Sequence, residues 1–136
     1  MTAVMSTPES SENAMRQPTP NSIEWNELIT PDPGAGARFY CELFGWTTEA
    51  MPLPGMPYTM FKLGERAFGG TMAPQQPGIP AHWLPYVSVA NIEDAVAKAT
   101  GLGGAVIVSP MSIGEAGRIA VLKDPQGAVF GLHQAG

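Results

Sequence analysis

Residues 32–46 read DPGAGARFYCELFGW, and this stretch decides the first structural unit of the chain. Asp32 is a typical N-cap residue, and Pro33 suits the first helical position, where its missing N–H is not needed. Gly45 stands where a helix would end. Between these ends an apolar face recurs at helical spacing, formed by Ala37, Tyr40 and Phe44 with Phe39 and Leu43 alongside. The stretch therefore predicts a helix, and residues 22–29 predict a strand that leads into it.

Three short strands are predicted after this helix, at residues 46–51, 58–63 and 67–72. Residues 73–80, APQQPGIP, contain too much proline for a central strand or a helix interior. They predict a linker. The first module, residues 22–72, is therefore a strand, a helix and three strands, a βαβββ unit.

The same order of elements returns after the linker. Residues 82–89 predict a strand, and Asn91 is suited to the N-cap of a second helix. The apolar positions of that helix again follow helical spacing: Ile92, Ala95, Val96, Ala99 and Leu102. Three more strands are predicted, with a loop over 109–115 and a type I turn over 124–127 between them, at 105–108, 118–123 and 128–133. The second module therefore spans residues 81–134.

A shift of 59 positions superimposes the two modules. It places Trp25 on Leu84, Asp32 on Asn91 and Gly45 on Gly104, so the element order and both helix ends coincide. We therefore predict an α+β fold in which two tandem βαβββ modules form a cupped mixed sheet. Its helices cover the outer face, and a hollow lies on the inner face.

Composition narrows the range of partners. A chain of 136 residues with 44% hydrophobic residues fits one compact domain, here residues 22–136. The formal net charge is −5 and the lysines and arginines form no cluster, so we expect neither nucleic-acid nor membrane binding. Residues 1–21 are rich in Ser, Thr, Pro and Asn and predict a flexible arm. The single Cys41 and the lack of a signal-peptide pattern favour the cytoplasm.

Two sequence motifs resemble those of a known superfamily. In the first module, Phe39-Tyr40 and residues 43–46, LFGW, follow the capping Asp32, and in the second the turn at 124–127 reads DPQG. Together these are similar to the vicinal oxygen chelate superfamily, which includes glyoxalase I, bleomycin-resistance proteins and extradiol dioxygenases. The resemblance covers residues 22–133. It implies paired βαβββ modules, a small-molecule ligand and a homodimer.

The resemblance also implies a divalent metal, held by His, Gln or Glu side chains on the first and last strands of the modules. Counting from the helix caps and from the DPQG turn places these ligands at Trp25, Leu84, Gly131 and the region 70–72. None of these side chains suits a divalent metal, so we expect neither a metal nor another cofactor. An ion held by Glu27 and His133 instead stays an alternative, although two ligands are fewer than a stable site generally wants.

Strand parity identifies the side chains that face the hollow. Trp25, Glu27 and Ile29 share one face because successive side chains alternate along a strand. Glu27 is either a ligand-contacting carboxylate or base with a raised pKa, or an acid satisfied at a sheet edge or dimer contact. Val87 and Val89 are expected to pack under the second helix, and His82 is expected to be exposed. The predicted ligand-binding residues are Trp25, Glu27, Tyr58, Met60, Leu84, Tyr86, Ser88, Arg118 and His133.

Three functional hypotheses follow. The first is a metal-free protein that binds a small organic molecule in a largely apolar hollow, with aromatic side chains stacking on a flat ligand. The second is a metal-dependent lyase, isomerase or dioxygenase of the same superfamily. The third is an interaction protein whose hollow is filled by its own side chains. The sequence names neither the ligand nor a reaction.

Overall fold

The computed structural model describes residues 19–51 and 53–136. Nearly all of the predicted arm, residues 1–21, lies outside this range. The last residue of the arm, Asn21, is bonded to the rest of the domain: its backbone N–H donates to the Ser88 carbonyl oxygen at 2.6 Å.

The first module folds as its sequence predicts. Its elements are β1 (Ile23–Ile29), α2 (Pro33–Phe44), β2 (Thr47–Ala50), β3 (Thr59–Leu63) and β4 (Arg66–Met72). The Asp32 side chain caps α2 by accepting the Ala35 backbone N–H at 3.1 Å. Gly45 ends the helix in the left-handed conformation, with φ of 77°, which glycine adopts without steric cost.

The second module repeats this order. Its elements are β5 (His82–Ser88), α3 (Ile92–Gly101), β6 (Ala105–Ser112), the 3₁₀ turn η1 (Gly114–Ala116), β7 (Arg118–Lys123) and β8 (Val129–Gln134). Asn91 caps α3 through the Asp94 backbone N–H at 2.9 Å. Asp124 shapes the turn between β7 and β8 by accepting the backbone N–H groups of Gln126 and Ala128.

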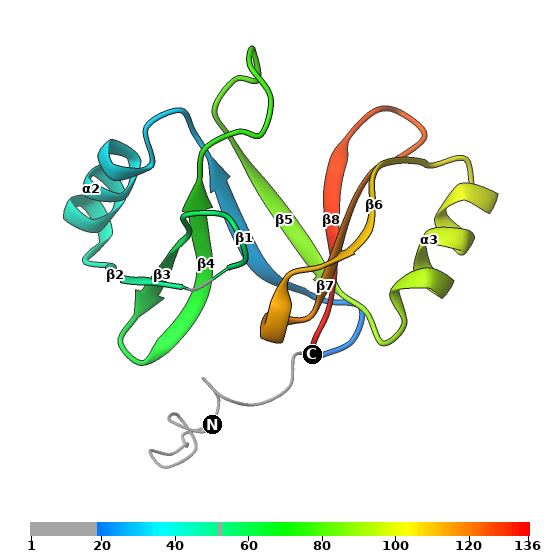
Figure 1. Ribbon diagram of the computed structural model, residues 1–136, viewed down its shortest axis with the longest axis horizontal. Coiled ribbons are helices and arrows are strands. Elements are labelled where there is room, and N and C mark those ends of the chain that lie inside the picture. Colours follow the sequence, from blue (N-terminus) through cyan, green and yellow to red (C-terminus); the bar gives the residue numbers. More distant parts are fainter. Residues whose placement is uncertain (1–18, 52) are drawn as a thin grey trace.

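All strands belong to one mixed sheet of eight strands in the order β2-β3-β4-β1-β5-β8-β7-β6. The first strand of each module pairs in parallel with the last strand of that module. β1 and β5 pair antiparallel at the centre and join the two modules. The two helices lie at the two outer sides of the curved sheet (Figure 1). The predicted α+β fold of paired βαβββ modules is therefore confirmed.

One boundary in the second module differs from its prediction. Residues 109–112, expected in a loop, belong to β6. β6 is an edge strand, and its pairing with β7 shifts register on both sides of Val108. An edge position and an irregular register both tolerate Pro110, which a central strand would not.

Two hydrophobic clusters fill the two faces of the sheet. Under α3, the fully buried side chains of Ile92, Ala120 and Leu122 pack together with Leu132, and Val87 and Val89 pack against them as predicted. The inner face carries the second cluster, which consists of Ile29, Tyr58, Met72, Leu84 and Tyr86. Within the described residues, neither helix has the length and apolar character of a membrane span.

Candidate functional site

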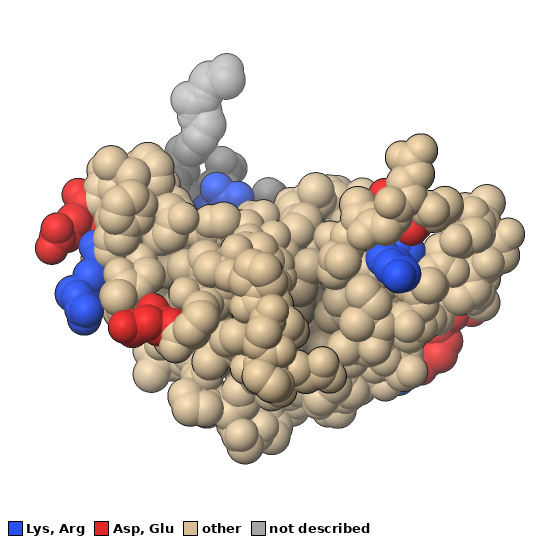
Figure 2. All heavy atoms as spheres, turned by 90° about the horizontal axis from the view of Figure 1, so that it is seen from above, with Lys and Arg blue, Asp and Glu red and all other residues tan. Residues whose placement is uncertain are grey.

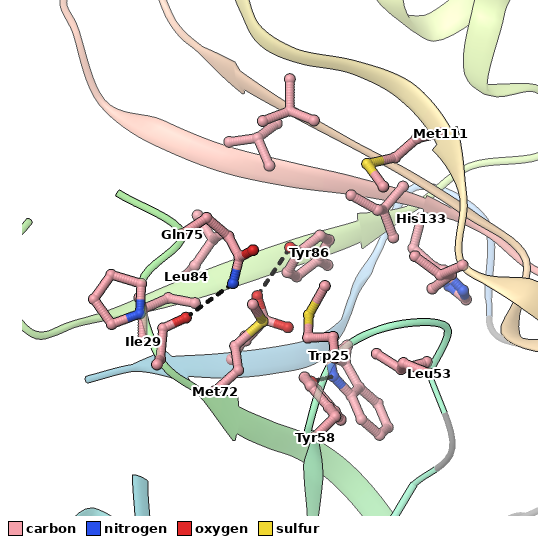
Figure 3. Close-up of a pocket in the computed structure, with 18 of the residues that line it drawn as sticks. Trp25, Ile29, Leu53, Tyr58, Met72, Gln75, Leu84, Tyr86, Met111 and His133 are labelled. Atoms are coloured by element: carbon pink, nitrogen blue, oxygen red, sulfur yellow. Dashed lines mark hydrogen bonds between the residues drawn. The ribbon is translucent and has the colours of Figure 1, made fainter. Parts of the chain in front are cut away.

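The inner face of the sheet encloses a pocket of about 390 Å³ between the two modules. Seen from above, the middle of the visible face carries no Lys, Arg, Asp or Glu side chain, and those that are visible lie toward its outer parts (Figure 2). Side chains from both modules point into one space, among them Trp25, Tyr58, Tyr86 and Met111 (Figure 3). The pocket is therefore an apolar cavity shared by the two halves of the chain.

Among residues 19–51 and 53–136, Glu27 is the one carboxylate that lines this pocket, and it is only 7% exposed. It lies on β1 between Gly70 of β4 and Leu84 of β5. The Tyr86 hydroxyl donates to Glu27 Oε1 at 3.0 Å (Figure 3). The Tyr58 hydroxyl also bonds the carboxyl group, and it accepts the indole N–H of Trp25 at 2.8 Å. We call Glu27, Tyr58, Tyr86 and Trp25 the Glu27 cluster.

Burial governs the protonation of this cluster. Removal from water raises the pKa of Glu27, because the charged form loses its hydration. The hydroxyls of Tyr58 and Tyr86 and the nearby His82 act in the opposite direction, but more weakly. Burial and the adjacent carboxyl raise the pKa of both tyrosines as well. The two phenols therefore stay protonated and act as hydrogen-bond donors to Glu27.

Two glycines make room for the tyrosine rings. A Cβ atom at Gly70 would lie 2.3 Å from the Tyr58 hydroxyl oxygen, and one at Gly131 would lie 2.4 Å from the Tyr86 ring. The positions are equivalent in the two modules, because Glu27 pairs with Gly70 and Tyr86 pairs with Gly131 across parallel strands. Glycine at both places lets the rings lie over the neighbouring strands and direct their hydroxyls at Glu27.

The same two glycines bear on the metal that the superfamily resemblance implies. Trp25, Leu84, Gly70 and Gly131 stand at or near the expected ligand positions, and none of them suits a divalent metal. The space over the two glycines holds tyrosine rings instead. Across residues 19–51 and 53–136, no three His, Cys, Asp or Glu side chains are grouped closely enough to hold an ion. The donor set in this pocket therefore does not fit a divalent metal.

Both histidines of the chain line the pocket. His133 Nε2 lies 2.7 Å from the Ala116 carbonyl oxygen, and His82 Nδ1 lies 2.8 Å from the Pro80 carbonyl oxygen. His82 is partly buried, so the expectation that it is exposed is wrong. Its strand parity with Leu84 and Tyr86 already indicated an inward direction.

Six of the nine predicted binding residues line the pocket: Trp25, Glu27, Tyr58, Leu84, Tyr86 and His133. Met60 packs against the inner core cluster without lining the pocket. Ser88 is buried at the end of β5. Arg118 Nη2 pairs with Glu93 Oε2 at 2.5 Å. Ligand binding by the six stays a prediction, and the other three are not part of this cavity.

The sequence indicated few of the residues that cover the pocket. The segment after β2 contributes Met51, Leu53 and Met56, and the proline-rich linker contributes Pro74, Gln75 and Ile79. β6 adds Val108 and Met111. Irregular segments have no periodicity that fixes the direction of a side chain, so parity could not place the first six. Met111 was missed because β6 was predicted to end at residue 108, whereas Val108 lies in the predicted strand but was not proposed as a pocket residue.

The family model of the glyoxalase-like domain matches residues 25–133. In Mycobacterium bovis, a protein provisionally named glyoxylase CFP32 is 42% identical over 112 residues, which cover 82% of this chain and 43% of the relative. The anthracycline biosynthesis protein DauV of a Streptomyces species is 32% identical over 132 residues, covering 86% of this chain and 48% of the relative. The chain thus spans less than half the length of these two relatives.

Solved structures share the fold. Methylmalonyl-CoA epimerase of Streptomyces coelicolor, bound to 2-nitronate-propionyl-CoA, superimposes with a TM-score of 0.65 at 17% identity, covering 86% of this chain and 99% of that one. The hypothetical protein BH1468 of Bacillus halodurans superimposes equally well, with a TM-score of 0.65 at 14% identity, covering 85% of this chain and 94% of that one. With its two βαβββ modules and the family match over residues 25–133, the chain belongs to the glyoxalase-like domain family.

Proposed function

We propose that this domain binds a small organic molecule in the pocket between its modules, without a metal. The observation that carries the proposal is a cavity of about 390 Å³ with apolar walls and one buried polar cluster, that of Glu27. Cavities of roughly 300–1,000 Å³ with a few well-placed polar groups are typical small-molecule sites. The donor set supports a metal-free site, because the positions expected to hold metal ligands carry Trp25, Leu84 and glycines.

The lining favours a compact, largely apolar molecule with a ring. Trp25, Tyr58 and Tyr86 offer aromatic surface, and four methionines supply flexible, polarisable contacts that adapt to a ligand's shape, namely Met51, Met56, Met72 and Met111. The name of the Streptomyces relative, an anthracycline biosynthesis protein, is consistent with a ligand that contains fused rings.

The other two hypotheses have less support. A metal-dependent lyase, isomerase or dioxygenase would need an ion between Glu27 and His133, and two side-chain ligands are fewer than a stable divalent site generally needs. A hollow filled by its own side chains is hard to reconcile with the open volume of the cavity. Metal analysis of the purified protein, with and without added divalent cations, tests the hypothesis of a metal-dependent enzyme. Stoichiometric metal retained after dialysis would overturn the metal-free proposal.

Filling the cavity tests the binding function itself. Val121 lines the pocket, so Val121→Trp should occupy much of its volume. Val129, 43% exposed on β8, does not line it, so Val129→Trp is a matched control. In thermal-shift titrations with aromatic metabolites, we expect saturable stabilisation of the wild type and the control but not of Val121→Trp. Equal stabilisation of all three proteins, or of none, would contradict the proposed site.

A second copy of the chain is part of the proposal. The curated relatives are about twice as long as this chain, so they have room for a second unit of this size. On α2, no residue is buried, and Phe39, Leu43 and Phe44 are 60%, 58% and 54% exposed. Exposed apolar patches commonly mark protein interfaces. We therefore propose a homodimer that covers α2. The cytoplasmic location rests on the sequence alone and stays a prediction.

A further inference from the structure

The hydrogen-bond donors of the pocket are already used within the protein. The Trp25 N–H bonds Tyr58, and both tyrosine hydroxyls bond Glu27. The two histidines each place one ring nitrogen against a backbone carbonyl oxygen. A carbonyl oxygen only accepts, so these ring nitrogens carry the proton and donate. In the described lining, the spare side-chain N–H groups that remain are confined to the amide of the exposed Gln75.

The groups left for a ligand are acceptors. The Glu27 carboxyl keeps lone pairs beyond the bonds that it receives from its two tyrosines. An imidazole in its neutral form has one ring nitrogen without a proton, so His82 and His133 can each accept one hydrogen bond in that form. The part of the lining that the structure describes contains neither Lys nor Arg. A ligand that donates hydrogen bonds therefore complements this pocket, and an anion finds no Lys or Arg side chain in the described lining.

Aromatic rings surround the same carboxyl group. The hydroxyls of Tyr58 and Tyr86 bond Glu27, and the Trp25 indole bonds Tyr58, so three rings lie close to the carboxylate. Their side chains point into the pocket beside one another (Figure 3). An ammonium group gains electrostatic attraction from aromatic faces, and the gain is largest when water is excluded. A carboxylate together with such rings is a suitable site for an organic cation.

We propose that the pocket selects an amine ligand, whose ammonium group contacts the Glu27 carboxylate among the rings of Trp25, Tyr58 and Tyr86 and whose apolar part fills the rest of the cavity. This inference rests on the proposed function and specifies its ligand class. The four methionines and the aliphatic walls would hold the carbon skeleton.

Binding of a cation is coupled to a proton. In the empty pocket, burial favours the protonated form of Glu27, while an ammonium group beside it favours the ionised form. The titratable groups that face Glu27 are Tyr58 and Tyr86, which stay neutral, and His82, while His133 lines the same pocket. A cation should therefore displace the Glu27 proton to solvent, and its affinity should rise with pH until Glu27 is ionised before binding.

A series with one carbon skeleton and three charges tests this. The probes are 2-phenylethylamine as the cation, 2-phenylethanol as the neutral compound and phenylacetate as the anion, titrated calorimetrically into the wild-type protein. We expect the cation to bind about tenfold more tightly than the alcohol, or better, and the anion to bind most weakly. Calorimetry in two buffers of different ionisation enthalpy should show proton release on binding of the amine.

Glu27→Gln should abolish the preference for the cation, because it removes the charge and keeps a similar shape. Glu65→Gln, at an exposed turn, should leave it unchanged. Equal affinity for amine and alcohol, tighter binding of phenylacetate, or an unchanged preference in Glu27→Gln would overturn the amine proposal. If 2-phenylethanol binds the wild type but not Val121→Trp, and the amine binds no more tightly than the alcohol, the proposed binding function stands while this inference fails. If none of the three probes binds, both fail.

Discussion

Glu27 lies where burial disfavours a charge, so its protonation should affect the stability of the protein. Its carboxyl group is almost fully buried and is bonded by two phenols. Without a ligand, desolvation destabilises the charged carboxylate by more than the two hydroxyls stabilise it. The pKa of Glu27 therefore rises above 4.5, the value of an ordinary Glu. The empty pocket therefore favours the neutral carboxyl of Glu27, and a cationic ligand would favour the charged form instead.

The stability of the protein should reveal this through its pH dependence. Because the folded state raises the pKa of Glu27, it binds the proton more tightly than the unfolded chain does. The free energy of unfolding contributed by Glu27 should thus be highest below pH 4.5 and fall as pH rises through the folded-state pKa. In urea unfolding across this range, Glu27→Gln should gain stability relative to the wild type as pH rises. The free energy of unfolding of the exposed Glu65→Gln variant should have the same pH dependence as that of the wild type. If the stability that Glu27→Gln gains over the wild type shrinks as pH rises, the pKa of Glu27 is not raised.

The packing of the site also explains why residue 131 is a glycine. A Cβ atom there would stand 2.4 Å from the Tyr86 ring, so Gly131→Ala must displace the ring or the strand. Overpacking of this kind costs about 1–3 kcal/mol, and we expect a lower midpoint in thermal unfolding together with weaker ligand binding. Gly101→Ala is the matched control, because Gly101 ends a helix with no atom nearby. A loss of stability no greater than in that control would show that the ring does not need the glycine.

Among the helices and strands, the boundaries that could be predicted from the sequence are those that local contacts determine. Both helices begin at the residues predicted from their caps, because Asp32 and Asn91 each bond a backbone N–H three residues ahead. The length of β6 could not be predicted in this way, since its continuation past Val108 depends on pairing with β7. Nor could the loops over the pocket, whose side-chain directions are set by tertiary contacts rather than by periodicity.

Helix α2 carries the most direct element-scale prediction. Leu43 is 58% exposed although it lies on the apolar face of the helix. If that face is covered by a second copy, Leu43→Glu should convert a dimer to a monomer in sedimentation velocity, because a carboxylate would be buried against apolar side chains. Glu42→Gln, at the neighbouring exposed position, should not change the sedimentation of the wild type. A wild-type protein that sediments as a monomer at all concentrations would rule out the homodimer.

For the whole molecule, the internal repeat is the feature that connects fold and site. Glu27 and Tyr86 are separated by 59 positions, the same offset that superimposes the modules, and they bond each other. Since β1 and β5 pair antiparallel at the centre of the sheet, equivalent residues of the two modules meet there. Parity along these two strands pointed to Trp25, Glu27, Leu84 and Tyr86, which line the cavity. The positions of the tyrosine rings over Gly70 and Gly131 could not be predicted from the sequence, because they depend on contacts across strands.

The central claim is that the cavity between the modules is the ligand site, and methionine methyl groups can report on it directly. Of the five methionines that the structure describes, four line the pocket, at positions 51, 56, 72 and 111. In a protein with ¹³C-labelled methionine methyls, titration with 2-phenylethylamine should move these four resonances along one saturable curve and give intermolecular NOEs to the phenyl ring. The account would be contradicted if the ligand saturates the protein while these four signals stay in place.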